Sequence, residues 1–142
     1  MSRIRSANTQ PELIVRKYLT LQGCRYRIHY PVSGRPDIAF PRKKMAIFIH
    51  GCFWHMHNCR LGRVVPKTNS VFWKNKRFSN KIRDKKILKA LEEQSWKVLV
   101  LWECQIEKND KLESALQDFL KFYYRLPLTS NLIKVLIKFY GQ

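Results

Sequence analysis

Residues 50–59 bring three histidines and two cysteines together, in the order His-Gly-Cys-Phe-Trp-His-Met-His-Asn-Cys. A structural zinc ion binds four thiolate or imidazole donors in a tetrahedron. Cys52, His57 and Cys59 supply three such donors from one irregular loop, while Cys104, just after a later apolar run, is the best candidate for the fourth. The sequence therefore predicts a Zn²⁺ site that fixes the loop to the end of a strand. The alternative is that the thiols are free and the imidazoles solvated.

A second group of residues could hold a harder cation. Asp37 follows Gly34-Arg-Pro and opens an expected strand, and the next expected strand ends at Ile49-His50. A carboxylate in that place can share Mg²⁺ with a backbone carbonyl of the neighbouring strand. Hydrolysis of a phosphodiester needs such a cation and a base near the attacking water, and His55 is the natural base because imidazole titrates near neutrality. The simpler interpretation of Asp37 is a turn residue after proline, so these residues alone leave catalysis undecided.

Aromatic and basic side chains alternate around the same loop. Phe53 and Trp54 lie within it, and Phe72 and Trp73 stand near the start of an expected helix. The basic residues near them are Arg60, Arg63, Lys67, Lys74, Lys76 and Arg77. Exposed aromatic rings can stack on bases or insert between base pairs while cations bind phosphate. Core packing is the alternative, and it is a stronger alternative for Phe72 and Trp73 than for Phe53 and Trp54.

The net charge of the 142-residue chain is +18, and it is distributed unevenly. Residues 1–90 contain 21 basic and only 3 acidic side chains, whereas residues 91–142 contain 7 of each. Such an excess indicates a polyanionic partner, nucleic acid before membrane. The chain has no apolar run of transmembrane length and no signal-peptide pattern, so we expect a cytoplasmic protein with its cysteines as thiols.

The elements that must position these residues follow from periodicity and capping signals. Thr9 and Glu12 form a T-x-x-E capping box at the start of the first helix. The expected helices span residues 10–22, 70–94 and a segment that begins at Asn109. The expected strands span residues 25–30, 37–40, 45–49 and 97–102. This order predicts a single α/β or α+β domain with a mixed sheet, in which the apolar run 97–102 is the central strand.

The long basic helix carries apolar residues that the pattern places on or near one face. They are Trp73, Phe78, Ile82, Leu88 and Leu91. Asp84, in the same helix, is expected to be solvated. The domain is expected to end near residue 125, and the apolar tail 126–142 could pack on it or meet a partner.

Four segments in this order resemble the very short patch repair endonucleases of bacteria. They are Gly34-Arg-Pro-Asp37, Phe48-Ile-His-Gly-Cys-Phe-Trp-His55, Phe72-Trp73 and Trp96-Lys-Val-Leu-Val-Leu-Trp-Glu-Cys104. The resemblance runs from about residue 3 to about residue 120. It implies a fold related to type II restriction endonucleases, with a central mixed sheet flanked by helices. It also implies an enzyme that nicks duplex DNA on the 5′ side of the thymine in a T·G mismatch, which deamination of 5-methylcytosine produces.

The resemblance assigns a role to individual residues. It implies that Asp37 and the backbone carbonyl of Ile49 bind a catalytic Mg²⁺, that His55 is the general base, and that His50 and Glu12 assist around the metal. The implied ligands of a structural Zn²⁺ are Cys52, His57, Cys59 and Cys104. The residues expected to contact DNA are Phe53, Trp54, Trp73, Arg60, Arg63, Lys74, Lys76 and Arg77. Glu12 is also explained by capping alone, so both interpretations remain open.

The expected partner is double-stranded DNA with a T·G mismatch, together with other mismatch-repair proteins. We expect a monomer in the bacterial cytoplasm, associated with the nucleoid and not with a membrane. A different class of protein fits the same residues, namely a zinc-stabilised nucleic-acid-binding module in which Asp37 and His55 have no catalytic role.

Overall fold

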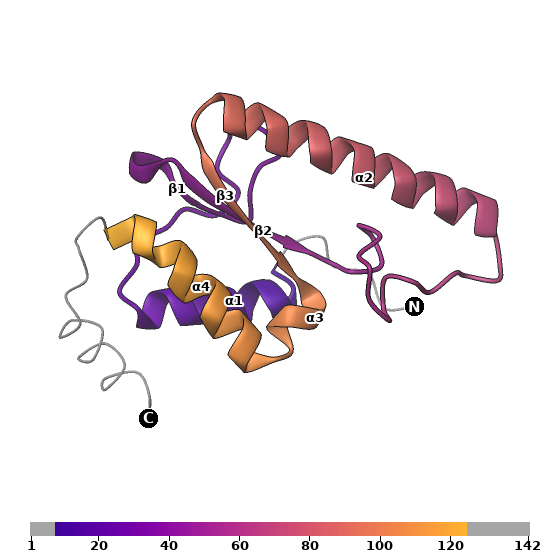
Figure 1. The fold of residues 1–142 in the computed structure, drawn as a ribbon, viewed down its shortest axis with the longest axis horizontal. Helices are drawn as coiled ribbons and strands as arrows, with labels where there is room; N and C mark the ends of the chain where they lie inside the picture. Colours follow the sequence, from indigo (N-terminus) through magenta and orange to yellow (C-terminus); the bar gives the residue numbers. More distant parts are fainter. Residues whose placement is uncertain (1–7, 125–142) are drawn as a thin grey trace.

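The computed structural model describes residues 8–124, which form one sheet and the helices that cover it (Figure 1). The tail 126–142 lies outside the described residues. The helices are α1 (Gln10–Leu21), α2 (Ser70–Glu93), α3 (Glu103–Ile106) and α4 (Asn109–Tyr124). The strands are β1 (Ile38–Phe40), β2 (Met45–His50) and β3 (Lys97–Trp102), with a 3₁₀ turn (Pro41–Lys43) between β1 and β2. Among these helices none is long and apolar enough to cross a bilayer.

The sheet is mixed and its strand order is β1-β2-β3. Antiparallel pairing of β1 with β2 aligns Ile38 with Ile47, and parallel pairing of β2 with β3 aligns Ile49 with Leu101. A parallel pair needs a crossover, which α2 provides. The expectation that residues 97–102 form the central strand is wrong, because β2 lies between the other two. The apolar character of β3 has another cause, which is that helices cover both faces of the sheet.

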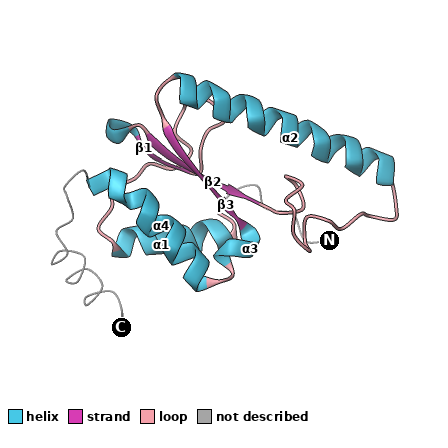
Figure 2. Cartoon of the chain, in the orientation of Figure 1, coloured by secondary structure: helices cyan, strands magenta, loops and turns pink. Residues whose placement is uncertain are grey.

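Helices lie on both sides of the sheet, α2 on one and α1, α3 and α4 on the other (Figures 1 and 2). On the α1 and α4 side, Leu19, Ile47 and Leu116 are fully buried in one core. On the other side, Leu91 of α2 is buried against Phe48. This layered arrangement confirms the predicted α/β domain with a mixed sheet flanked by helices.

The first helix begins as the capping signals predict. The Thr9 hydroxyl accepts a hydrogen bond from the backbone N–H of Glu12, and Pro11 lies in the first turn, where its missing N–H costs little. By contrast, the predicted strand over 25–30 is wrong. The segment forms a single bridge, Arg27 to Ala39, and His29 adopts a left-handed conformation (φ 50°) that interrupts extended pairing.

The apolar residues of α2 do not all share one face. Leu91 is fully buried, whereas Phe78 and Ile82 are 56% and 42% exposed. Nine residues separate Ile82 from Leu91, and at about 100° per residue this places the two side chains on opposite sides of the helix. The prediction of one shared apolar face is therefore wrong for Phe78 and Ile82.

Candidate active site and Cys/His cluster

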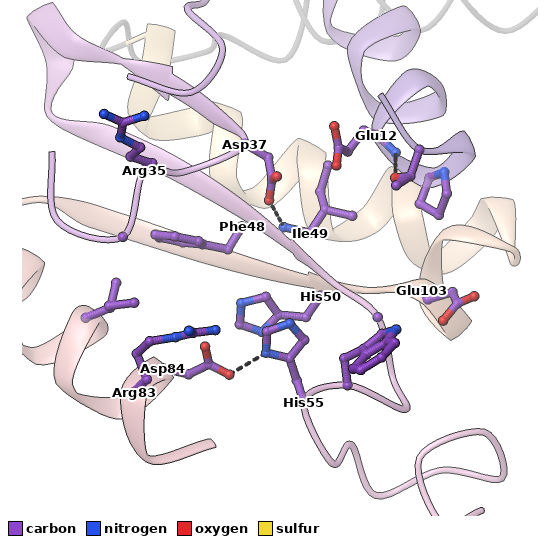
Figure 3. A pocket seen from close by; sticks show the side chains of 16 residues that line it. Glu12, Arg35, Asp37, Phe48, Ile49, His50, His55, Arg83, Asp84 and Glu103 are labelled. Atoms are coloured by element: carbon purple, nitrogen blue, oxygen red, sulfur yellow. Dashed lines mark hydrogen bonds and ion pairs between the residues drawn. The ribbon is translucent and has the colours of Figure 1, made fainter. Parts of the chain in front are cut away.

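A cavity of about 820 Å³ opens where the start of α1, the segment before β1, the end of β2, the loop after β2, the middle of α2 and the start of α3 meet. Figure 3 shows charged and polar side chains from all these elements around it. The lining includes Glu12, Asp37, His50, His55, Asp84 and Glu103. The structure therefore brings together the four side chains for which a catalytic role is expected, although they are spread from residue 12 to residue 55.

Asp37 immediately precedes β1 and lines the cavity from that position. Its carboxylate accepts a 2.7 Å hydrogen bond from the backbone N–H of Ile49 in β2. Burial raises the pKa of Asp37, and the hydrogen bond from Ile49 offsets part of that rise. A half-buried carboxylate of this kind is an oxygen ligand that a divalent cation in the cavity would hold ionised.

His55 and Asp84 form the closest polar pair of the cavity. The Nδ1 atom of His55 lies 2.5 Å from a carboxylate oxygen of Asp84, although the two residues are 29 positions apart (Figure 3). A carboxylate at Nδ1 orients the imidazole and favours the tautomer with its proton on Nδ1. The other ring nitrogen, Nε2, is then the one that can accept a proton. The expectation that Asp84 is a solvated helix residue is wrong.

His50 packs beneath this pair. Its ring is stacked on that of His55, with centroids 3.9 Å apart and an angle of 3° between the planes. Burial, followed by the neighbouring His55, lowers the pKa of His50 to about 4, so the ring is neutral at pH 7. Its Nδ1 atom is buried and has no hydrogen-bond partner within the described chain. A neutral stacked ring gives His55 a flat support without adding positive charge.

Glu12 is almost fully buried at the edge of the cavity. One of its carboxylate oxygens accepts hydrogen bonds from the backbone N–H of Asn8 and from the Arg16 guanidinium, each 3.0 Å long. The carboxylate therefore bonds to the residue before the N-cap and not to Thr9, which a regular capping box would require. Both interpretations of Glu12 retain support, since it organises the helix start and also lines the cavity.

The four residues expected to bind zinc also come together in the structure. The ligand atoms of Cys52, His57, Cys59 and Cys104 all lie within 4.8 Å of one another, and none of these cysteines is in a disulfide. We call these four residues the Cys/His cluster. Cys104 lies in α3, directly after β3, so the cluster joins the loop to the end of the sheet as the sequence predicts. Three sulfurs and one imidazole nitrogen are a donor set that fits a tetrahedral Zn²⁺.

Backbone contacts hold the Cys/His cluster together. The backbone N–H of Cys104 points to the sulfur of Cys52, and that of Gly62 points to the sulfur of Cys59, each at 3.4 Å. A side chain at Gly62 would overlap the backbone of His57, so the loop can close only with glycine at this position. Burial raises the pKa of Cys52 to about 12, and a bound cation would reverse this by favouring the thiolate.

The loop and the start of α2 form an aromatic cluster. The rings of Phe53, Trp54 and Trp73 contact one another edge to face, with centroids 5.4–5.9 Å apart. Lys76 lies over Trp54 at 5.7 Å from the ring centroid. The amide of Asn80 donates to the backbone carbonyl of Trp54 and so fixes the loop to α2. These half-buried rings are therefore held against the start of α2.

The cations expected to bind DNA are not equally free. Arg60, Lys74 and Lys76 are exposed, whereas Arg63 donates two hydrogen bonds to Asn58. Arg77 is only 5% exposed, and its guanidinium donates to the backbone carbonyls of Phe53, Gly62 and Val64. Because all three donors point into the loop, Arg77 is placed to hold the loop and not to contact DNA.

Sequence reasoning missed several residues of the cavity. Asp84 is the most important, and Arg35, Arg83 and Glu103 also line the cavity. Glu103 accepts a 3.3 Å hydrogen bond from the backbone N–H of Cys52, which lies in the Cys/His cluster. A signal for Asp84 was available, because it lies seven residues before the buried Leu91 and therefore on the same side of α2.

Comparison with known proteins identifies the family. The family model for the DNA mismatch endonuclease Vsr matches residues 1–61. The chain is 40% identical to the type II nicking enzyme V.XorIIP of Xanthomonas oryzae pv. oryzae, over 84% of this chain and 88% of the relative. It is 44% identical to the type II nicking enzyme V.NmeAIP of Neisseria meningitidis serogroup A, over 75% of this chain and 76% of the relative.

A third relative carries the family name itself. The chain is 38% identical to the DNA mismatch endonuclease Vsr of Escherichia coli K12, over 79% of this chain and 72% of the relative. The match extends well beyond the residues covered by the family model. This chain therefore belongs to the Vsr family of DNA mismatch endonucleases.

Proposed function

We propose that this protein nicks duplex DNA on the 5′ side of the thymine in a T·G mismatch, in repair of deaminated 5-methylcytosine, and that Mg²⁺ is its catalytic cation. Family membership supports endonuclease activity on mismatched DNA. The observation that carries the proposal is that Asp37 shares one cavity with the His55–Asp84 pair. A carboxylate for a cation and an oriented base are the two parts that phosphodiester hydrolysis requires.

Asp37 and the backbone carbonyl of Ile49 are the proposed ligands of Mg²⁺, with Glu12 and His50 nearby. The cation, when bound, would neutralise charge on the scissile phosphate. Asp37 is held for this task by the hydrogen bond from the Ile49 N–H, which fixes one of its oxygens. The cations Arg35 and Arg83, which also line the cavity, are suited to attract the phosphate.

His55 is the proposed general base. Asp84 holds Nδ1, so Nε2 accepts the proton of the attacking water, and Asp84 stabilises the imidazolium that results. The stacked, neutral His50 keeps the ring from tilting. These contacts fix the base before DNA arrives, which lowers the reorganisation needed in the transition state.

The aromatic cluster is the proposed mismatch reader. Phe53, Trp54 and Trp73 form a block of rings beside the cavity, and a T·G pair is easier to unstack than a Watson–Crick pair. Insertion of these rings beside the mismatch would open the duplex next to the cavity. The exposed cations Arg60, Lys74 and Lys76 would contact the adjacent phosphates.

Several further features are part of the proposal. The Cys/His cluster holds a structural Zn²⁺, and the fold is related to that of type II restriction endonucleases. The protein acts as a monomer in the bacterial cytoplasm, associated with the nucleoid and with other mismatch-repair proteins. Support for the zinc is the donor set of three sulfurs and one imidazole.

The test is a nicking assay on end-labelled duplexes that differ only at one base pair. With Mg²⁺, the enzyme should cut the T·G duplex once, on the 5′ side of the thymine, and should cut the matched T·A duplex at least about a hundred times more slowly. Equal rates on the two duplexes would contradict mismatch specificity. Cutting at another position would contradict the proposed site of attack.

A further inference from the structure

The outer face of α2 carries a row of apolar side chains that no described part of the chain covers. Val71, Phe78 and Ile82 are 71%, 56% and 42% exposed. In the same order, they lie nine residues before Asn80, Ile87 and Leu91. These three later residues face the loop or the sheet. Because nine residues amount to two and a half turns, the three apolar side chains point directly away from the rest of the domain.

Lysines border this row. We define the outer face of α2 as Val71, Phe78, Lys81, Ile82, Lys85, Lys86 and Lys89, all of which are exposed. Within residues 8–124, none of these four lysines forms an ion pair or a hydrogen bond. An apolar row with unpaired cations on both sides is typical of a surface that receives an amphipathic segment.

The outer face does not continue the proposed DNA-contacting surface. Trp73 and Asp84, which belong to the aromatic cluster and the cavity, lie on the opposite side of α2. No other described element lies on the outer side of α2 in Figure 1. Phosphate contacts require cations but gain little from a row of three bulky apolar side chains, so a protein partner fits this face better than a second stretch of DNA.

The positive charge of the outer face of α2 determines which kind of segment can bind there. The segments outside the described residues cannot supply a complementary charge, because residues 1–7 and 125–142 contain arginine and lysine but no aspartate or glutamate. A second copy of the same face would also be repelled by its own lysines. The occupant must therefore come from elsewhere and must carry carboxylates.

We propose that the outer face of α2 docks an acidic amphipathic helix of a partner protein. Apolar side chains of that helix would pack on Val71, Phe78 and Ile82, and its carboxylates would pair with the flanking lysines. Such docking leaves the cavity and the aromatic cluster free for DNA. The proposal goes beyond mismatch cleavage and does not depend on which mismatch is cut.

The experiment uses a designed probe, a fluorescein-labelled 21-residue helical peptide with leucines along one face and glutamates along the rest. Full-length protein should bind it, and the double substitution Phe78→Ser/Ile82→Ser should raise the dissociation constant at least about tenfold. Lys81→Gln/Lys85→Gln should weaken binding by about three- to tenfold and reduce its salt dependence.

Matched controls distinguish peptide binding at the outer face of α2 from non-specific hydrophobic binding and from non-specific charge attraction. Leu21→Ser/Phe122→Ser removes two side chains of similar exposure from α1 and α4, and Lys108→Gln/Lys111→Gln removes two exposed lysines near the start of α4. Both control variants should bind the peptide within about twofold of the wild type. Nicking of the T·G duplex should be the same for the wild type and for Phe78→Ser/Ile82→Ser.

Three results would overturn the proposal. The first is equal peptide binding by the wild type and both outer-face variants, with melting curves that show folded protein. The second is a loss of duplex binding in Phe78→Ser/Ile82→Ser, which would make the face a DNA contact. The third is a wild-type dimer in sedimentation that this substitution dissociates, which would make the occupant a second copy. A failure of the nicking assay alone would leave the peptide result unaffected.

Discussion

The active-site cluster and the Cys/His cluster both include residues of the segment 50–59, yet they differ in almost every physical respect. We define the active-site cluster as Asp37, His50, His55 and Asp84. It contains carboxylate oxygens and imidazoles and lines a cavity. Within it, Nε2 of His55 is the nitrogen that can accept a proton. The Cys/His cluster contains three sulfurs and one imidazole and has its ligand atoms within 4.8 Å of one another.

One loop thereby supplies residues both to a site suited to chemistry and to a site suited to holding the shape of the loop. The segment 50–59 supplies both clusters, with His50 and His55 in the cavity and Cys52, His57 and Cys59 in the other cluster. Soft donors that saturate a cation leave it no open position, so that cluster can only fix geometry. Hard oxygen donors leave a cation partly hydrated and able to act on a phosphate.

The largest expected effect comes from breaking the active-site cluster alone. Asp37→Asn keeps the shape of the side chain but removes the charge that would hold the cation, so nicking of a T·G duplex should fall at least about 10³-fold. Zinc content and melting temperature should stay near wild-type values. Metal analysis, melting curves and single-turnover nicking on the same preparation check this. Loss of zinc in this variant would show that the two clusters are not independent.

Breaking the Cys/His cluster should affect both regions. Cys104→Ser removes the one ligand that lies outside the loop, so the bound zinc per chain should fall from about one to well below one. Because the loop also carries His55 and Trp54, duplex binding and nicking should fall together. Zinc analysis and a duplex-binding titration measure the two effects. Normal mismatch binding by zinc-free protein would contradict the role assigned to the cluster.

Asp84→Asn tests the orientation of the base. The amide keeps a hydrogen bond to His55 but does not stabilise the imidazolium, so the nicking rate at saturating DNA should fall about 10²- to 10⁴-fold. The dissociation constant for the T·G duplex should change by less than about threefold. A purely structural role would change both quantities and the melting temperature together, and such a result would exclude Asp84 as a positioning residue.

Much of this arrangement could be predicted from the sequence. The start of α1 follows from a capping box, β2 and β3 follow from apolar runs, and the Cys/His cluster follows from donor types at close spacing. These signals are local, or involve residues whose chemistry is specific to few tasks. The pairing of His55 with Asp84 could not be predicted in this way. Asp84 lies 29 residues from His55 and meets it only once α2 packs on the sheet.

The lysines and arginines of residues 60–89 show the same limit of prediction from sequence. Lysine and arginine recur so often over residues 60–89 that the sequence does not distinguish an exposed cation from a buried one. The sequence groups Arg77 with Lys74 and Lys76 as a DNA contact, but the burial of Arg77 depends on where the loop carbonyls lie after folding. The face of α2 is similarly ambiguous, since a helix with apolar residues on both sides gives no single periodic signal.

The smallest expected effect concerns Arg77, which holds the shared loop from α2. Arg77→Met keeps most of the side-chain volume but leaves the carbonyls of Phe53, Gly62 and Val64 without their donor. The free energy of unfolding should fall by about 2–4 kcal/mol. Denaturant titration measures this, with Lys81→Met on the exposed side of the same helix as the control. Equal stability of the two variants would contradict the role assigned to Arg77.

In the proposed mechanism the active-site cluster cuts DNA, whereas the Cys/His cluster only maintains the shape of the loop. The most direct measurement is the nicking rate of a T·G duplex as Mg²⁺ is added to protein that already holds one zinc per chain, in buffer freed of other divalent ions. We expect no nicking before Mg²⁺ is added, a rate that rises to saturation with Mg²⁺, and a zinc content that stays at one throughout. Full nicking by the zinc-loaded protein without Mg²⁺ would contradict this mechanism.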